Sequence, residues 1–407
     1  MQDGVIILFL FALGACIGSF LNVVVWRLPR GESLSSPPSH CPNCNERLRW
    51  YDNIPVIGWL KLKGKCRFCK QPISPRYPII ETLTGGLFVF YYAMFFMTQT
   101  GPCATPPRML EFGLDWPVYF LYVATVAALL AASLIDAKLF MIPLGLCYFI
   151  AAIGFVVHTI VDTPGLPGAV SATPLGAAMA FGGGAGVLLS LLLLKLKIVP
   201  LSFPDGELLE IDREFIQKEI DDAKATGGEV PEMPVFLTSS QVRREISKEM
   251  LFLIPPMLGA IAAAVIVSQS AGASQLWDRA MTVQPFAAFA GALLGALVGA
   301  FVVWIIRILG TLGFGRVAMG LGDAHLMFGV GAVLGAGGAT VAFFLAPFFG
   351  ILFALYRWIT GKGHEMPYGP YLSMATCFVM LFYCPIYEYL RPGLEGLAII
   401  LSGRMGQ

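Results

Sequence analysis

Charged side chains are scarce in this chain. Asp, Glu, Lys and Arg make up 13% of its 407 residues, whereas a soluble domain carries roughly 25%. Hydrophobic residues reach 57%, so most of the surface lacks the polar cover that water requires. This composition excludes a soluble globular protein, a disordered chain and a collagen-like fibre. We therefore predict one polytopic membrane protein rather than two or three soluble domains.

Basic residues are also missing before the first apolar run, and Arg27 and Arg30 follow it directly. A signal peptide carries positive charge on its N-terminal side, so we expect a retained helix with its N-terminus outside. A spanning helix needs about 20 apolar residues, and about ten segments satisfy this rule. A tight turn at Gly335–Gly338 is expected to separate the eighth from the ninth. The segments are 5–26, 79–98, 117–135, 141–161, 174–194, 250–270, 284–309, 326–338, 340–358 and 368–390.

The distribution of charge predicts the orientation. Residues 27–78 hold ten Lys and Arg against three acidic residues, which by the positive-inside rule makes this loop cytoplasmic. Further basic residues then fall on the same side, and the opposite loops hold only Arg108 and Arg279. An even number of spans leaves the C-terminus outside. The cytoplasmic set is Lys138, Lys195, Lys197, Arg307, Arg316, Arg357 and Lys362.

A second polar segment, 198–249, contains twelve acidic residues. Apolar residues recur in it at helical spacing, and Thr238-Ser-Ser-Gln241 has the form of a capping box. We interpret the segment as a helical hairpin on the membrane surface, with a solvated spacer as the alternative.

Four of the nine cysteines form two Cys-x-x-Cys pairs separated by 21 residues: Cys41 with Cys44 and Cys66 with Cys69. This spacing is typical of a zinc ribbon, and four thiolates leave the metal no open position. We predict structural Zn²⁺, which would supply folding energy to a loop with little core. A reduced, metal-free pair of turns is the alternative.

Two aspartates lie at predicted cytoplasmic helix ends: Asp136, and Asp323 in Met319-Gly-Leu-Gly-Asp323. Either alone could be a helix cap or an interfacial residue. Two carboxyl groups brought close share a proton, so that one can activate water while the other donates to the scissile carbonyl, as in aspartic proteases. Intramembrane carboxylates can also serve ion transport.

These residues resemble the type 4 prepilin peptidase family, and the matching blocks occur in the family's order over most of the chain. The family implies that Asp136 and Asp323 are the catalytic pair. It implies cleavage of a basic leader after Gly on the cytoplasmic face, then methylation of the new N-terminus with S-adenosylmethionine. Glu81 is a candidate cofactor-binding residue only through this resemblance. The blocks are Gly18-Ser-Phe-Leu-Asn-Val23, Arg27-Leu-Pro29, the four cysteines, Asp52-Asn-Ile-Pro-Val56, Gly64-Lys-Cys-Arg67, Pro72-Ile-Ser74, Arg76-Tyr-Pro78 with Glu81, Asp136 to Pro143, Met319 to Asp323, and Met366-Pro-Tyr-Gly-Pro-Tyr-Leu372.

The chain departs from the family pattern in three places. His325 stands where Lys is common, Leu144 stands where a second Asp is common, and 196–283 includes an insertion. No soluble nucleotide-binding fold is recognisable, and the glycines of 182–186 fit helix packing better than a cofactor loop.

The resulting prediction is an all-α polytopic protein of about 8–10 transmembrane helices with a small cytoplasmic zinc-ribbon loop. We expect it in the bacterial inner membrane, with prepilins or pseudopilins, the lipid bilayer and type IV pilus or type II secretion machinery as partners, and no nucleic acid. A peptidase without methyltransferase activity, and an inactive scaffold or transporter, are the alternatives. The expected regions are 1–26 (first helix), 27–78 (zinc loop), 79–197 (helices with Asp136), 198–249 (acidic insertion), 250–393 (helices with Asp323) and 394–407 (tail).

Overall fold

The computed structural model describes residues 2–102, 108–162, 166–203, 237–360 and 367–401. The chain divides into two compact units. The first contains residues 1–170 and 337–407, and the second contains residues 171–336. The predicted hairpin within 198–249 falls mainly on residues 204–236, which lie outside the described ranges.

The described residues form helices and no named strand; their only β-bridges join His40 to Arg47 and Lys65 to Pro72. Nine of the helices described are long and apolar enough to cross a membrane. In a bilayer an α-helix satisfies its own backbone N–H and C=O groups, which explains why such a sequence folds this way. The predicted all-α polytopic fold is confirmed.

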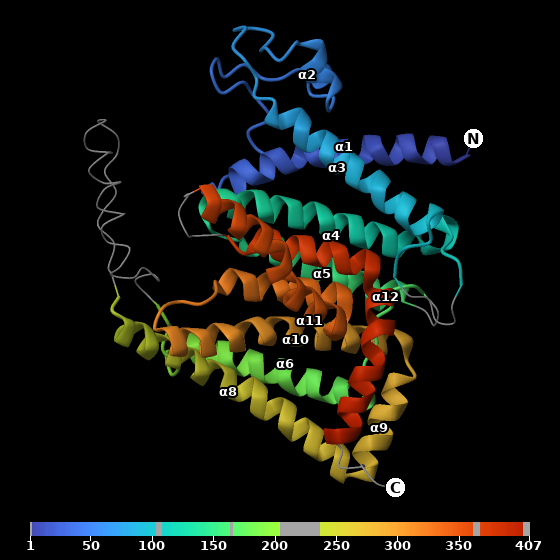
Figure 1. The fold of residues 1–407 in the computed structure, drawn as a ribbon, viewed down its shortest axis with the longest axis vertical. Coiled ribbons are helices and arrows are strands. Elements are labelled where there is room, and N and C mark those ends of the chain that lie inside the picture. Colours follow the sequence, from blue (N-terminus) through green and yellow to red (C-terminus); the bar gives the residue numbers. More distant parts are fainter. Residues whose placement is uncertain (1, 103–107, 163–165, 204–236, 361–366, 402–407) are drawn as a thin grey trace. The chain divides into compact units, whose positions relative to one another are not determined.

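The first unit is built around α4, a helix with buried side chains on every face. Hydroxyl groups tie neighbouring helices to it and to each other. Tyr119 on α4 donates to the carbonyl oxygen of Phe88 on α3 at 2.8 Å, and Tyr91 on α3 donates to that of Cys377 on α12 at 2.9 Å. The unit comprises α1 (Gln2–Arg27), α2 (Ile57–Lys61), α3 (Arg76–Tyr92), α4 (Phe112–Leu139), α5 (Leu144–Val161) and α12 (Gly369–Leu401), together with part of α11 (Figure 1).

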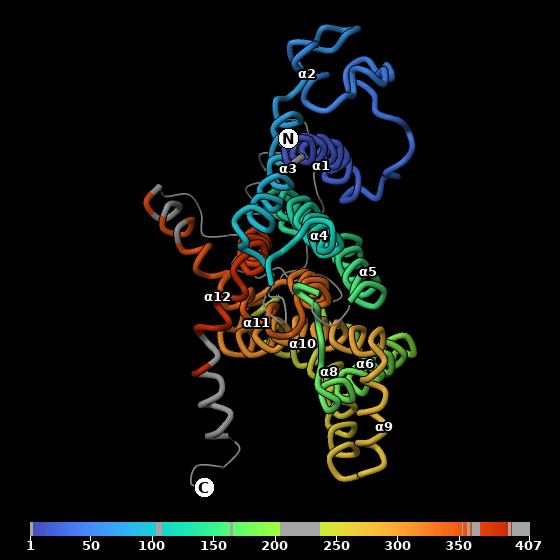
Figure 2. The backbone as a smooth tube through the Cα atoms, turned by 90° about the vertical axis from the view of Figure 1, so that its right-hand side faces the viewer, coloured from blue at the N-terminus to red at the C-terminus, as the bar shows by residue number. Residues whose placement is uncertain are grey.

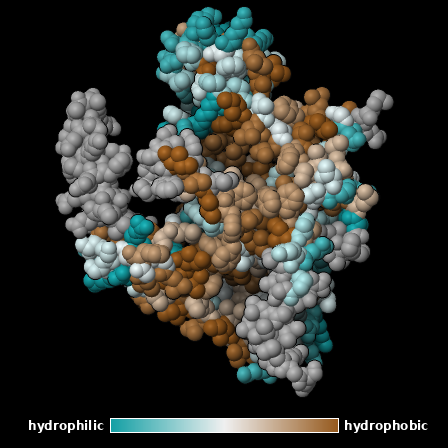
Figure 3. Space-filling model, viewed as in Figure 1, coloured by the Kyte–Doolittle hydropathy of each residue, from teal (hydrophilic) through white to brown (hydrophobic). Residues whose placement is uncertain are grey.

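Glycines allow α1 and α3 to approach closely. A Cβ added at Gly14 would lie 2.8 Å from the Cα of Gly85, and one added at Gly85 would lie 2.9 Å from the carbonyl oxygen of Phe11. Helices in membranes pack through small residues because burial from water does not drive them together. The residues between α1 and α3 form the predicted zinc loop, whose surface is largely hydrophilic in Figure 3.

The second unit contains α6 (Pro174–Lys195), α8 (Ser239–Gln269), α9 (Ala271–Met281), α10 (Gln284–Phe314) and the first part of α11 (Leu321–Thr360). α6 packs closely on α8, and Figure 2 shows the two side by side. A Cβ added at Gly186 would fall on the backbone of Pro255 and Pro256. The interpretation of residues 182–186 as a helix-packing segment is confirmed.

The capping box is also confirmed. The Thr238 hydroxyl accepts a hydrogen bond from the backbone N–H of Gln241, whose side chain accepts one from the N–H of Thr238 at 2.8 Å. One helix was not predicted: α9 occupies the expected outer loop 271–283, and the Ser270 hydroxyl caps it by accepting from Ala273 N at 3.3 Å.

The structure confirms the expected division of 326–338 from 340–358. Both segments lie in one element, α11, whose helical path is interrupted only at Gly335, with φ 70° and ψ 177°. Glycine adopts this conformation without steric cost, so a kink at this single residue separates the two helical parts of α11. The predicted tight turn therefore consists of one residue, and the nine candidate spans found among the described residues agree with the expected number of about 8–10.

The α1–α3 contact predicts opposite effects for two adjacent glycines. Gly85→Ala places a methyl group against backbone, whereas Gly86 has no atom within 4 Å of an added Cβ. An alanine in open helix surface is worth roughly 0.5–1 kcal/mol relative to glycine. We expect Gly85→Ala to lower the thermal unfolding midpoint in detergent and Gly86→Ala to leave it unchanged or raise it. Equal midpoints for the two variants would contradict the close packing.

Candidate functional site

The four cysteines of the zinc loop converge. Their sulfur atoms all lie within 4.8 Å of one another. The Cys41 and Cys69 sulfurs are 3.8 Å apart, and those of Cys44 and Cys66 are 4.0 Å apart. Four thiolates at about 2.3 Å from one tetrahedral ion are about 3.8 Å from each other. The arrangement therefore fits a single zinc ion held by all four.

The two Cys-x-x-Cys turns have the same backbone geometry. Asn45 N donates to Cys41 O at 2.9 Å, and Lys70 N donates to Cys66 O at 3.1 Å. Asn45 and Lys70 both have left-handed conformations, with φ of 56° and 62°. Hydrogen bonds from the N–H groups of Cys69 and then Phe68 lower the pKa of the Cys66 thiol to about 7. This turn favours the thiolate form that binds a metal. In the other pair, a backbone hydrogen bond from Glu46 lowers the pKa of the Cys44 thiol, but burial and hydrogen bonds among the sulfurs outweigh it and raise that pKa to about 11.

An ion pair stabilises the loop away from the sulfurs. Arg67 Nε donates to Asp52 Oδ2 at 2.7 Å, and a second guanidinium nitrogen contacts Oδ1. This hydrogen bonding and the positive charge lower the pKa of the Asp52 carboxyl below its usual value. A carboxyl group with a lowered pKa stabilises the fold at neutral pH, and this contribution is lost as the pH falls through that pKa.

Glu81 lies at the junction between the zinc loop and α3. It is 7% exposed, and its Oε2 accepts a hydrogen bond from the backbone N–H of Val56 at 2.7 Å. Val56 has φ 60°, a conformation that is rare for a β-branched residue. Glu81 therefore holds a strained turn of the loop against the helix.

Asp136 lies in the last turn of α4 and is 6% exposed. Its Oδ2 accepts a hydrogen bond from the backbone N–H of Gly369 at 3.0 Å, at the start of α12. A Cβ at Gly369 would lie 2.6 Å from that oxygen, so only glycine permits the approach. The N-terminal N–H groups of a helix favour a carboxylate.

Asp323 lies in the first turn of α11 and is also 6% exposed. Its backbone N–H donates to Gly320 O at 3.3 Å. His325, two residues later, has its Nδ1 2.8 Å from Leu321 O, so Nδ1 carries a proton and donates it. Asp136 belongs to the first unit and Asp323 to the second.

The structure thus brings the four cysteines together, ties Glu81 to the loop and buries each aspartate. The sequence reasoning did not single out Gly369, although it lies in the Met366–Leu372 block. It also counted Arg307 only as a cytoplasmic charge, whereas the structure buries it in an ion pair with Glu249. Arg307 is the only charged residue of α10, and Glu249 directly precedes the predicted span 250–270, which is the signal that could have suggested this pair.

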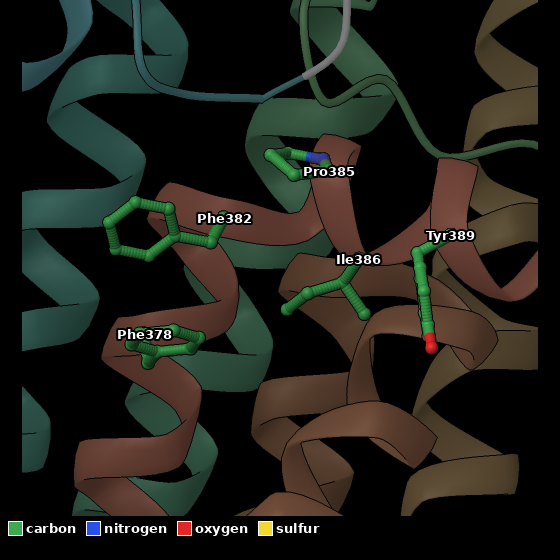
Figure 4. Close-up of a pocket in the computed structure, with 5 residues that line it drawn as sticks. All are labelled: Phe378, Phe382, Pro385, Ile386 and Tyr389. Carbon is green, nitrogen blue, oxygen red and sulfur yellow. The ribbon is translucent and has the colours of Figure 1, made fainter.

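Two further features lie apart from these residues. Cys384 is disulfide-bonded. An apolar hollow lies beside Phe382, where the helical path of α12 is interrupted. It contains none of the predicted site residues. Phe378, Phe382, Pro385, Ile386 and Tyr389 line it (Figure 4).

The helices and the four-cysteine site define a polytopic α-helical membrane protein with a small metal-binding loop. Residues 12–95 match the Bacterial Peptidase A24 N-terminal domain, and residues 244–355 match the Type IV leader peptidase family. These two ranges are thus similar to a family of bacterial leader peptidases. The first range contains the zinc loop and Glu81, and the second contains Asp323, while Asp136 lies between the two.

Relatives of known name agree with this result. A prepilin leader peptidase/N-methyltransferase of Myxococcus xanthus is 56% identical over 80 residues, 20% of this chain and 24% of that protein. One of Klebsiella pneumoniae is 54% identical over 87 residues, 20% of this chain and 38% of that protein. One of Burkholderia pseudomallei is 34% identical over 168 residues, 35% of this chain and 48% of that protein. The chain thus spans about a quarter to a half of the length of these relatives. No solved structure matches the chain.

The sulfur geometry predicts one zinc ion per chain. We expect elemental analysis of purified protein to find it, and Cys44→Ser to lose it because three thiolates and a hydroxyl bind zinc more weakly. Cys16→Ser is the matched control, because Cys16 is exposed on α1 and is not part of the cluster. Equal zinc content in both variants, or none in the unmodified protein, would contradict the site.

Proposed function

We propose that this protein is a membrane aspartic endopeptidase that removes the leader peptide of type IV prepilins or pseudopilins after a Gly. The observation that carries the proposal is the match of both family domains, one on each side of Asp136. Relatives named prepilin leader peptidase/N-methyltransferase support it.

We assign the peptide-bond chemistry to Asp136 and Asp323. In the proposed mechanism the two carboxyl groups share one proton. The ionised carboxyl deprotonates a water molecule that attacks the scissile carbonyl, and the protonated carboxyl donates to the carbonyl oxygen. As the C–N bond of the tetrahedral intermediate breaks, the proton gained by the first carboxyl passes to the leaving amine. The second carboxyl recovers its proton from the hydroxyl of that intermediate, so the pair returns to its starting state. The burial of both side chains supports this role, because a low dielectric strengthens the sharing of a proton.

The form of the substrate explains why such a peptidase lies within a membrane. A prepilin carries a short basic leader before a long apolar helix, so docking of that helix among the spans would bring the cleavage point to the membrane edge. We place this edge on the cytoplasmic face of the bacterial inner membrane, because the positive-inside rule puts residues 27–78 there.

We also propose that the enzyme methylates the new N-terminal residue with S-adenosylmethionine. The zinc loop lies in the matched N-terminal domain, and the names of the relatives include this activity. When bound, zinc would hold the two Cys-x-x-Cys turns together without an open position for catalysis. Glu81 anchors the loop to α3 through the N–H of Val56, which places its carboxylate where loop and membrane helix join.

The decisive experiment incubates purified protein with S-adenosylmethionine and a prepilin whose leader ends in Gly before Phe. We expect mass spectrometry to find cleavage after Gly and one added methyl group. Asp136→Asn and Asp323→Asn should each reduce cleavage by at least about 100-fold, because general acid–base catalysis is typically worth 10²–10⁴. Asp278→Asn is the control, since Asp278 is exposed on α9.

The outcomes separate the alternatives. Cleavage without methylation would leave a peptidase only. Cleavage that survives either active-site substitution would refute the aspartate assignment. Absence of cleavage with several prepilins would favour the inactive scaffold or transporter.

Glu81 can be tested separately, because Glu81→Gln keeps an oxygen that accepts from Val56 N–H and removes the charge. If the carboxylate contacts the methyl donor or the substrate amine, we expect Glu81→Gln to lower methylation at least about tenfold, as loss of one charged hydrogen bond would, with cleavage unchanged. Glu81→Leu should in addition release zinc more readily. Full methylation by Glu81→Gln would limit the residue to its anchoring contact.

A further inference from the structure

The turn that leads to Asp323 is held by side chains of the preceding helix. α10 ends at Gly315, which has φ 68°, and α11 begins at Leu321. Thr311 Oγ1 accepts a hydrogen bond from Ala318 N at 3.1 Å, and Arg307 Nη1 donates to the carbonyl oxygen of Met319. Arg307 and Thr311 are four residues apart and therefore project from the same face of α10.

Arg307 makes these contacts from a buried position. It is 1% exposed, and its partner Glu249 on α8 is 4% exposed. Arg307 Nη2 lies 2.9 Å from Glu249 Oε1, and Nε lies 3.1 Å from Oε2. Glu249 also accepts from Trp304 Nε1 at 2.6 Å and from the Ser202 hydroxyl at 3.2 Å.

Stability alone does not account for a buried ion pair within spanning helices. Desolvation costs several kcal/mol per ion, and a well-packed apolar pair of similar volume is often as stable. Charged residues at membrane depth therefore indicate function by default. Arg307 is suited to two tasks at once, because the planar guanidinium can bind a carboxylate along one edge and donate to a carbonyl from the other.

Only two residues separate the Met319 carbonyl from the Gly322–Asp323 peptide bond. Asp323 N–H donates back to Gly320 O at 3.3 Å, and a Cβ at Gly320 would lie 3.4 Å from Asp323 Oδ2. The Gly320 backbone therefore lies directly beside the carboxyl group. A shift of the turn at Met319 would move the carboxyl group with it.

We propose that Arg307, oriented by Glu249, and Thr311 are positioning residues that fix the Met319–Asp323 turn and thereby the carboxyl group of Asp323. The assignment rests on the proposed peptidase function. None of the three side chains touches the substrate in this role. Removing them should lower the rate of the chemical step and leave substrate binding intact.

The first test uses two substitutions at Thr311, which is fully buried. Thr311→Val has nearly the same shape but cannot accept from Ala318 N–H, whereas Thr311→Ser keeps the hydroxyl. We expect Thr311→Val to lower kcat for prepilin cleavage roughly 10- to 100-fold, as a misplacement of up to about 1 Å would, with KM unchanged. Thr311→Ser should retain most of the activity.

The second test removes the ion pair without leaving a buried charge. In the double variant Glu249→Leu with Arg307→Met, apolar side chains replace both ions, so no charge is left buried. Trp304 Nε1 and the Ser202 hydroxyl lose their acceptor, so the unfolding midpoint should fall modestly. The hydrogen bond to Met319 is lost, so kcat should fall as in Thr311→Val. Ser190→Ala is the matched control, because it removes a buried interhelix bond of the same unit, 2.7 Å from Ser190 Oγ to Phe252 O, without touching the turn.

The results distinguish the two levels of inference. If the unmodified protein cleaves prepilin and Thr311→Val and the double variant do so at the same kcat, the positioning role is refuted while the peptidase function stands. Equal losses in Thr311→Ser and Thr311→Val would also refute it, because packing would then be the cause. If the double variant does not fold, the Thr311 pair alone decides. An unmodified protein that cleaves no prepilin would overturn the proposed function and this role with it.

Discussion

The structure depends on one constraint: within a bilayer, polar groups must find their partners inside the protein. The backbone meets it by forming helices, and hydroxyl groups such as those of Tyr91, Tyr119 and Ser190 meet it by donating to carbonyl oxygens of neighbouring helices. Buried charged groups such as Arg307 meet it by pairing with an opposite charge on another helix. Contacts of this kind hold two segments of the chain in a fixed relation.

The candidate site residues illustrate this constraint in three forms. Asp136 accepts from a backbone N–H that only a glycine can bring close enough. The turn before Asp323 is held by a hydroxyl group and by a guanidinium whose charge a carboxylate balances. Glu81 accepts from a strained turn of the zinc loop. In the proposed enzyme, the same hydrogen bonds that make burial tolerable also fix the geometry that catalysis needs.

The zinc loop solves a different problem, because a polar segment of about 50 residues has too little apolar surface for a core. Four thiolates and one ion pair replace that core. A closed four-thiolate site gives the loop a rigid shape without reactive metal chemistry. That property suits a platform attached to a membrane helix, and the bond between Glu81 and Val56 provides the attachment.

The sequence by itself determined the helical membrane fold, the four-cysteine cluster and the capping box at Thr238, because these depend on composition or on residues close in the chain. It also indicated Asp136 and Asp323 as candidates. It could not determine that Gly369 approaches Asp136, that Glu81 holds Val56, or that Glu249 pairs with Arg307 58 residues away. Those contacts join distant segments, and only helix packing selects which of the available partners meet. In α11 the glycine-rich run predicts a break, and the structure locates that break at the single residue Gly335.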